Sequence, residues 1–292
     1  MSNPVDETIK NLKEIDSDEI SAKKTDKQED LNQLNQFLLE KQERLKWKME
    51  LKQQNQNAAY KDELQLKKLD SSIKKVTAFI KRLKTLTESQ KDTLSKEMAQ
   101  LNLSKYLSEV AAAFTEAKLK MNDISCALHL CSQMHQNYAE YSSLLFEQWQ
   151  KILNIKKDDK ILNPSKLRVD LRFFAELISI GVLAQKEALS LLGNQLTVLT
   201  LHDKEFVNIS IISSFCKHCG EDFANLIPAK YVQISIENNI EIPHNNLYSI
   251  EKQKAVKTLL KDYFKSLCQF YLNEHKEIQK QERQNKKTYQ VA

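Results

Sequence analysis

The sequence predicts an all-α protein, and two observations carry this prediction. The chain has only 3 glycines and 4 prolines in 292 residues, where ordinary usage would give about 20 and 15. Sheet folds and phosphate-cradling nucleotide folds need these residues at turns with special backbone angles. In addition, apolar residues recur at helical spacing along most of the chain. We therefore expect long helices joined by short loops.

The charged N-terminal quarter divides into two parts. Residues 1–27 have isolated apolar side chains among many charges and no sustained stripe, which predicts a disordered tail. Within residues 28–69 the apolar side chains fall near a seven-residue spacing: Leu31, Leu34, Leu38, Leu45 and Met49. The stripe stops near Gln53, too soon for a coiled coil. We interpret residues 28–69 as a charged, solvated helical arm that precedes a domain at 70–292.

The first helix of that domain has two chemically different faces. Its apolar face is formed by Ile73, Val76, Phe79, Ile80, Leu83 and Leu86. Its opposite face carries Lys74, Lys75, Lys81, Arg82 and Lys84 and no acidic residue. These five residues are our candidate contact site for RNA or a protein partner, and an ordinary solvated surface is the alternative. The face lacks aromatic residues for base stacking, so any RNA would be bound through its phosphates and in a salt-sensitive way.

Capping residues mark the later helices. Thr87 with Gln90 has the pattern of a capping box, and Asn163 precedes Pro164 at a favourable first helical position. Further helix starts are expected at Asn122 with Asp123, at Asp203 and at Ser249. We expect Gly220 to end one helix in a left-handed cap and Pro228 to open the next.

Apolar stripes give each of these helices a buried side. One stripe is formed by Leu167, Leu171, Phe174 and Ile178, and another by Ile209, Ile212, Cys216 and Cys219. The last helix has Val256, Leu259, Leu260, Phe264 and Leu267, and it becomes polar after Leu272. Roughly ten helices with short connections predict antiparallel hairpins stacked into a HEAT-like solenoid. Because no repeat period is readable, a compact bundle is the alternative.

No motif in the chain predicts catalysis. A Walker loop, a dinucleotide fingerprint, a nucleophile elbow and an H-E-x-x-H sequence are all missing. We therefore predict a protein that is not an enzyme and has no small-molecule substrate.

Two groups of histidines and cysteines resemble halves of a zinc site. They are Cys126, His129, Cys131 and His135, and then Cys216, His218 and Cys219. On a helix, however, Cys126 points about 140° away from Cys131, so the first group does not converge. We interpret the five cysteines as reduced core residues and expect no metal or other cofactor.

Charge and hydropathy restrict the surroundings and the partners. No run of about 18 apolar residues is present, and the N-terminus lacks a signal sequence, so we expect no membrane contact. We predict a cytoplasmic protein, with a perinuclear or partly nuclear location as the alternative. Residues 70–292 hold 31 Lys and Arg against 25 Asp and Glu, a mild excess that permits RNA binding without requiring it.

Several separated segments resemble one family in the same order. The first are Ser71-Ser-Ile-Lys-Lys-Val-Thr-Ala-Phe-Ile-Lys-Arg-Leu-Lys, Leu101-Asn-Leu-Ser-Lys-Tyr and Glu116-Ala-Lys-Leu-Lys. The later ones are Cys126-Ala-Leu-His-Leu-Cys-Ser, Lys166-Leu-Arg-Val-Asp-Leu-Arg-Phe-Phe-Ala-Glu-Leu, Ser214-Phe-Cys-Lys-His-Cys-Gly and Glu282-Arg-Gln-Asn. Together they resemble the first middle domain of the regulator of nonsense transcripts 2 family, the up-frameshift protein 2 adaptors of nonsense-mediated mRNA decay.

This resemblance implies the middle-domain fold of initiation factor 4G, a crescent of HEAT-type hairpins that binds proteins or RNA. It implies a non-enzymatic scaffold whose partners belong to the mRNA decay machinery. Such adaptors have three middle domains and a helicase-binding segment, whereas this chain stops after one middle domain, so we expect it to be truncated or to be encoded by an incomplete or split gene. The alternative function is an RNA-binding middle domain that acts in translation initiation.

Overall fold

The fold is described by a computed structural model. It gives the backbone of residues 4–157 and 159–291, and the side chains of residues 27–157 and 159–286. The chain forms two compact units: the first comprises residues 1–47 and 227–244, and the second comprises residues 48–226 and 245–292. Within the described residues, no helix is both long and apolar enough to cross a bilayer.

The first unit pairs part of helix α1 (Pro4–Gln56) with helix α11 (Ala229–Glu237). The rings of Phe37 and Tyr231 stack with centroids 4.3 Å apart, and Lys230 pairs with Asp30 at 3.0 Å. Pro228 precedes the first residue of α11, which confirms that a helix begins there.

The backbone is helical from Pro4, where we predicted a disordered tail over residues 1–27. Lysine and glutamate are good helix formers, so a polar segment can be helical without an apolar face. Residues 1–3 and the side chains of residues 4–26 lie outside the described part of the chain. That the side chains of residues 1–27 do not pack against the domain therefore remains a prediction.

The second unit contains the end of α1 and ten further helices in its described part. They are α2 (Glu63–Lys67), α3 (Ile73–Leu83), α4 (Lys91–Gln100), α5 (Leu107–Glu116), α6 (Ile124–Asn137), α7 (Tyr141–Ile152), α8 (Pro164–Ser179), α9 (Lys186–Leu201), α10 (Ile209–Ala224) and α12 (Ile250–Val291).

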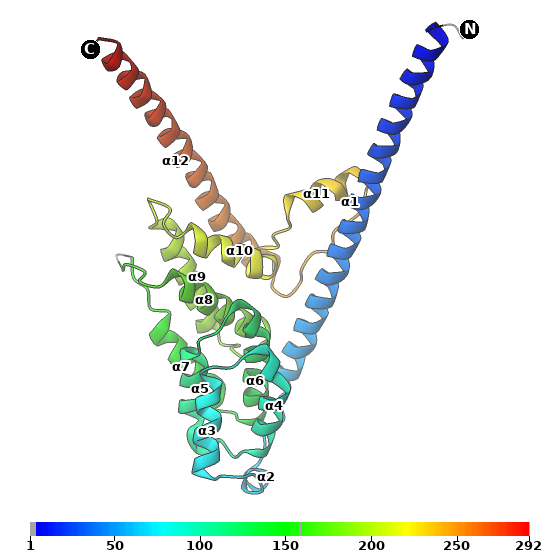
Figure 1. The fold of residues 1–292 in the computed structure, drawn as a ribbon. Coiled ribbons are helices and arrows are strands. Elements are labelled where there is room, and N and C mark those ends of the chain that lie inside the picture. The colour runs from blue at the N-terminus through cyan, green and yellow to red at the C-terminus, as the bar shows by residue number, and fades with distance from the viewer. Residues whose placement is uncertain (1–3, 158, 292) are drawn as a thin grey trace. The chain divides into compact units, whose positions relative to one another are not determined.

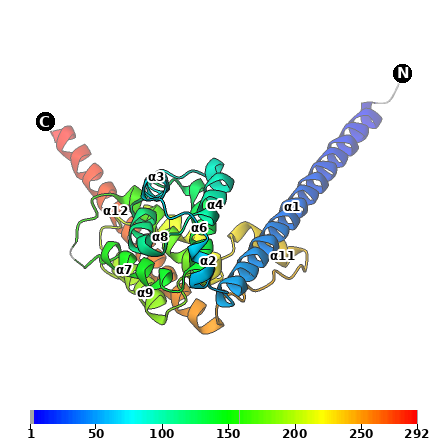
Figure 2. The same ribbon diagram turned by 90° about the horizontal axis from the view of Figure 1, so that it is seen from below.

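These helices stack in two rows (Figures 1 and 2). Helices α3, α5 and α7 follow one another in one row, and α4, α6, α8, α10 and α12 follow one another in the second. Within these two rows each helix packs on the helix two places along the chain, as successive hairpins of a solenoid do, whereas α9 packs on α8 and α12. No strand occurs in the described part, where Asp70 and Leu101 form an isolated bridge. The all-α, HEAT-like prediction is confirmed, and the compact-bundle alternative does not fit this order of neighbours.

A continuous apolar core runs between the rows. Trp149 of α7 lies against Phe173 and Phe174 of α8, with ring centroids 5.6 and 5.5 Å away. All three side chains are buried, as are the predicted α8 residues Leu167 and Leu171. Aromatic contacts of this kind add to the stability that apolar burial provides.

Three predicted apolar positions are exposed instead. Ile73 is 69% and Phe264 is 61% exposed, and Ile209 lies at the first residue of α10 with 39% exposed. The first and third begin helices, where fewer neighbouring elements can cover them. In α12 Leu260 is buried and Val256 and Leu259 are partly buried against the core, as predicted, and Gln253 and Tyr263 belong to the same buried face.

Two predicted helix boundaries had different outcomes. The Asn163 side chain accepts a hydrogen bond from the Lys166 backbone N–H at 2.9 Å, which confirms that cap.

Gly220, by contrast, lies inside α10, and the left-handed residue is Asn225 with φ 45°. A Cβ at Gly220 would lie 2.8 Å from Cδ1 of Leu226. The glycine therefore permits close packing of the turn that follows α10.

Candidate interaction surface

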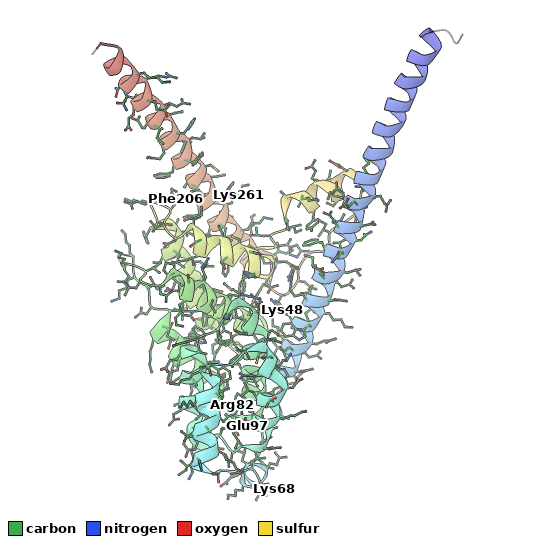
Figure 3. All side chains as sticks on the ribbon, in the orientation of Figure 1. Lys48, Lys68, Arg82, Glu97, Phe206 and Lys261 are labelled. Carbon is green, nitrogen blue, oxygen red and sulfur yellow. The ribbon has the colours of Figure 1, made fainter. Side chains whose placement is uncertain are left out.

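The cationic face of α3 is built as predicted but is partly neutralised by neighbouring elements. Lys75 pairs with Asp70 at 2.5 Å, and Lys84 pairs with Glu116 of α5 at 2.7 Å. Arg82 pairs with Glu97 of α4 (Figure 3). The sequence of α3 itself contains no acidic residue. The three acids that pair with its cations come from the preceding loop and from two other helices.

Lys74 and Lys81 are the remaining members of the predicted site. They lie two turns apart on α3, both are exposed, and neither has an ion pair within the described residues. The face therefore presents two unneutralised charges and not five. Arg82 is half-buried and bound to Glu97, so a glutamate at position 82 would face a like charge.

A second basic surface, which the sequence did not predict, lies in a groove of about 1030 Å³. We call it the α5–α8–α10 groove: it lies among the end of α5 with the loop to Met121, the start of α8, and α10. Its basic residues are Lys118, Lys166, Arg168, Lys217 and His218, and its acidic residues are Glu116 and Asp170. The residues are far apart in sequence, so no linear pattern indicates the groove.

Both acids of the groove are already paired. Glu116 binds Lys84, and Asp170 binds Lys166 through both carboxylate oxygens at 2.8 Å. Burial raises the pKa of Asp170, and Lys166 opposes that shift. Burial lowers the pKa of His218, and nearby Arg172 lowers it further, which favours the neutral form. Lys118, Arg168 and Lys217 are therefore the cations of the groove that no carboxylate neutralises in the described part of the chain.

The loop on one side of the groove is fixed by hydrogen bonds. The Lys118 backbone N–H donates to the Lys84 carbonyl at 3.1 Å. Arg172 of α8 donates to the Met121 carbonyl, also at 3.1 Å. Because both ends of the loop are held, the groove wall is positioned by α3 and α8.

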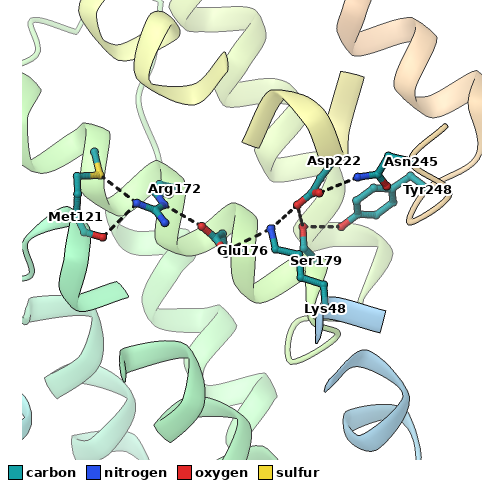
Figure 4. Close-up of polar contacts among 8 residues, drawn as sticks. All are labelled: Lys48, Met121, Arg172, Glu176, Ser179, Asp222, Asn245 and Tyr248. Carbon is teal, nitrogen blue, oxygen red and sulfur yellow. Dashed lines mark hydrogen bonds and ion pairs between the residues drawn. The ribbon is translucent and has the colours of Figure 1, made fainter. Parts of the chain in front are cut away.

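Beneath the surface, Lys48 of α1 is buried among acidic residues of two other helices (Figure 4). Its Nζ lies 2.5 Å from Asp222 of α10 and 3.4 Å from Glu176 of α8, and all three side chains are buried. Asn245 donates to Asp222 at 3.0 Å, and Arg172 donates to Glu176 at 2.8 Å. The network thereby connects α1, α8, α10 and the segment before α12.

The charges of this network stabilise one another. Burial alone would lower the pKa of Lys48, but Glu176 and Asp222 outweigh it and raise the pKa to about 12. Burial alone would raise the pKa of Glu176, but Lys48 and Arg172 outweigh it and lower the pKa below its ordinary value. Lys48 and Glu176 are therefore both charged near neutral pH, which is typical of a structural ion cluster.

The end of α1 therefore differs from the solvated arm that we predicted over residues 28–69. Asn55 is also buried, and it donates to the Ile180 carbonyl at 2.8 Å. Lys48 and Asn55 continue the helical spacing of the apolar stripe from Leu45, but with polar side chains. Apolar periodicity alone does not indicate these two residues, because their side chains are polar. The same helical spacing includes them when polar residues are counted as well.

The cysteines and histidines do not gather into a metal centre. Among the described residues, no three His, Cys, Asp or Glu side chains lie close enough together to hold a metal ion. Cys126, Cys131 and Cys219 are buried, and burial raises the pKa of Cys126 to about 11, so its thiol is a poor nucleophile. Cys268 is exposed on α12, which corrects our assignment of all five cysteines to the core.

Comparisons with known proteins agree on one family. The MIF4G domain family matches residues 66–289. Regulator of nonsense transcripts 2 from Homo sapiens is 44% identical over 248 residues, which are 84% of this chain and 20% of that protein. Regulator of nonsense transcripts UPF2 from Arabidopsis thaliana is 30% identical over 279 residues, which are 92% of this chain and 23% of that protein. The chain thus spans about a fifth of the length of these curated relatives.

A solved structure shares both the sequence and the fold. The crystal structure of the first MIF4G domain of human nonsense mediated decay factor UPF2 is 43% identical and superimposes with a TM-score of 0.83. The match covers 89% of this chain and 85% of that chain. The resemblance that the separated sequence segments indicated is therefore confirmed.

Proposed function

The chain belongs to the MIF4G domain family, and on this premise we propose that it is a scaffold domain of nonsense-mediated mRNA decay. In this role it binds proteins of the decay machinery and carries out no reaction itself. The observation that carries the proposal is the match to the first MIF4G domain of a human decay factor, at 43% identity over 89% of this chain. A cytoplasmic location, where translated mRNA is inspected, is part of the same proposal.

The structure supports a scaffold in two ways. The solenoid offers extended surfaces along its two helix rows, and such surfaces are commonly used for binding partners. The buried ion network joins α1, α8 and α10, so these elements keep a fixed geometry on which a partner can dock. Neither feature provides an activated nucleophile or a positioned acid and base.

The second candidate function is an RNA-binding domain that acts in translation initiation. Lys74 and Lys81 favour it, because both are exposed and have no ion pair within the described residues. Contacts through these lysines would be made with phosphates and would weaken steeply as salt rises.

Affinity capture from a native extract of the source cells separates the two functions. The bait is the tagged chain, captured with and without ribonuclease and analysed by mass spectrometry. A scaffold of decay should recover decay factors in both samples, because the contacts are made between proteins. Recovery of initiation factors that disappears after ribonuclease would contradict the scaffold proposal and support the RNA-binding alternative.

A direct binding assay completes the comparison. The purified chain is titrated against fluorescent single-stranded RNA at low and at physiological salt, beside the variant Lys74→Glu/Lys81→Glu. The scaffold proposal predicts weak RNA binding that the variant hardly changes at physiological salt. Tight binding that the variant abolishes would support the alternative function.

A further inference from the structure

The α5–α8–α10 groove combines two kinds of lining. Lys118 and Lys217 are exposed on elements that face the groove from different parts of the chain, and neither has an ion pair within the described residues. The lining also includes the partly buried side chains of Leu119, Met121 and Val169, which we call the apolar floor of the groove. A ligand that fits this surface therefore needs negative charge together with an apolar group.

Hydrogen-bond donors supplement the cations. Ser210, Ser213 and Ser214 of α10 all line the groove, and hydroxyl groups can donate to carboxylate oxygens. Arg168 donates through one terminal nitrogen to Ser165, which holds its guanidinium at the groove. Both acids of the lining are engaged by Lys84 and Lys166, so they do not offset the attraction for an anion at close range.

The lining distinguishes between two classes of macromolecule. Single-stranded RNA is typically held by aromatic side chains that stack on its bases, in addition to cations that contact its phosphates. None of the residues that line the groove is a phenylalanine, tyrosine or tryptophan. A peptide that alternates acidic and aliphatic side chains matches both the cations and the apolar floor.

We propose that the α5–α8–α10 groove binds an acidic peptide segment of a partner protein, with carboxylates on Lys118, Arg168 and Lys217 and an aliphatic side chain on Leu119, Met121 and Val169. Because the groove is proposed as a site for a partner protein, this inference rests on the scaffold function proposed above. It adds which chemical kind of peptide the scaffold binds. The binding itself is a property of the purified chain, so it can fail or succeed independently of any role in mRNA decay.

The test is fluorescence anisotropy with the full chain and synthetic probes at physiological salt. The main probe is a labelled peptide of four Glu-Asp-Leu repeats. Its comparison probes are four Gln-Asn-Leu repeats, which lack charge, four Glu-Asp-Ser repeats, which lack the aliphatic group, and a twelve-nucleotide oligouridine. We expect the Glu-Asp-Leu peptide to bind more tightly than each of the other three.

The variant Lys118→Glu/Lys217→Glu should weaken binding of this peptide at least about tenfold, because both cations become repulsive. The matched control is Lys74→Glu/Lys81→Glu, which changes the net charge equally but on α3, and it should weaken binding less than about threefold. Lys118→Gln/Lys217→Gln, which removes charge without reversing it, should give an intermediate loss. All four lysines are exposed, so circular dichroism and melting should be unchanged.

Three outcomes would overturn the proposal. Equal weakening by the groove variant and the α3 variant would show diffuse attraction and no site. Equal affinity for the Glu-Asp-Leu and Glu-Asp-Ser peptides would show that the apolar floor is unused. Oligouridine that binds more tightly than the peptide and is lost in the groove variant would assign the groove to RNA.

Discussion

At the scale of single residues, Lys48 shows how strongly one buried charge can determine stability. Its ammonium group is 2.5 Å from Asp222 and 3.4 Å from Glu176, and its residue is 2% exposed. A pair of this kind contributes little compared with apolar side chains of equal volume, but removing one partner leaves a buried charge without compensation. The acids, and not the lysine, then become the source of instability.

We predict that Lys48→Met lowers the free energy of unfolding by about 3 to 5 kcal/mol. Methionine preserves much of the side-chain volume, so the loss reports the uncompensated charges of Asp222 and Glu176. Urea unfolding followed by circular dichroism measures it. The matched control Lys74→Met, on the exposed side of α3, should stay within about 0.5 kcal/mol of the wild type. Similar small losses for both variants would contradict the buried network.

A second prediction at this scale concerns pH and His135. Its Nε2 lies 3.1 Å from the Asn55 carbonyl, and its buried Nδ1 has no hydrogen-bond partner. Burial lowers the pKa of His135, and burial likewise lowers the pKa of His129 and His218. As pH falls through the ordinary histidine pKa near about 6.5, the unfolded chain takes up protons that the folded chain does not. Stability should therefore fall from pH 7.5 to pH 5.5.

Urea unfolding at these two pH values checks the sign of the effect. His135→Gln should reduce the difference between the two pH values, because glutamine can still donate to Asn55 but binds no proton. The control His275→Gln lies on an exposed part of α12 and should leave the difference unchanged. A wild-type chain that is more stable at pH 5.5 than at pH 7.5 would refute the argument.

At the scale of helices, the end of α1 belongs to the domain that we predicted to begin at residue 70. Lys48 and Asn55 are buried in the second unit, and Ser132 of α6 donates to Asn55 at 2.7 Å. The Lys61 backbone N–H also donates to the Asn137 carbonyl at 3.2 Å. Residues 48–69 therefore complete the fold of the second unit.

We predict that a chain of residues 70–292 is less stable than a chain of residues 48–292 by at least about 3 kcal/mol, because Asp222 and Glu176 lose Lys48. Removing residues 1–27 from the full chain should leave the melting temperature unchanged, since few apolar side chains are lost. Thermal melting of the four proteins, the full chain included, measures both effects. Equal melting of the 70–292 and 48–292 chains would show that the end of α1 contributes nothing.

The elements that could be predicted from the sequence are helices whose buried side chains are apolar and lie close to one another in the sequence. Val76, Phe79 and Leu83 show their spacing within one helix, and Asn163 with Pro164 shows a helix start within two residues. Lys48 could not be recognised in the same way, because its burial depends on acids 128 and 174 residues later in the chain. The groove cations Lys118 and Lys217 are likewise brought to one surface only by the stacking of helices.

At the scale of the whole second unit, the number of buried residues in a helix depends on the position of that helix in its row. Helix α6 lies between α4 and α8, and α8 lies between α6 and α10. Nine of the residues of α6 and ten of those of α8 are buried, whereas α3 at the start of its row has three. In a solenoid each element is stabilised chiefly by its neighbours, so elements at an end open more easily than elements in the middle.

We therefore predict that native-state hydrogen exchange is slowest in α6 and α8, faster in α3, and fastest in α12 beyond Tyr263. From Phe264 to Lys286 the α12 side chains are exposed apart from the half-buried Leu267, so little tertiary packing protects that segment. Mass spectrometry of peptic fragments measures the rates, and the Lys48→Met variant supplies an internal comparison.

Because Lys48 contacts α8 and α10, the variant should accelerate exchange in these two helices more than in α3. Uniform acceleration in all helices would instead mean that the unit unfolds as a single cooperative body, in which neighbours in the stack make no separate contribution.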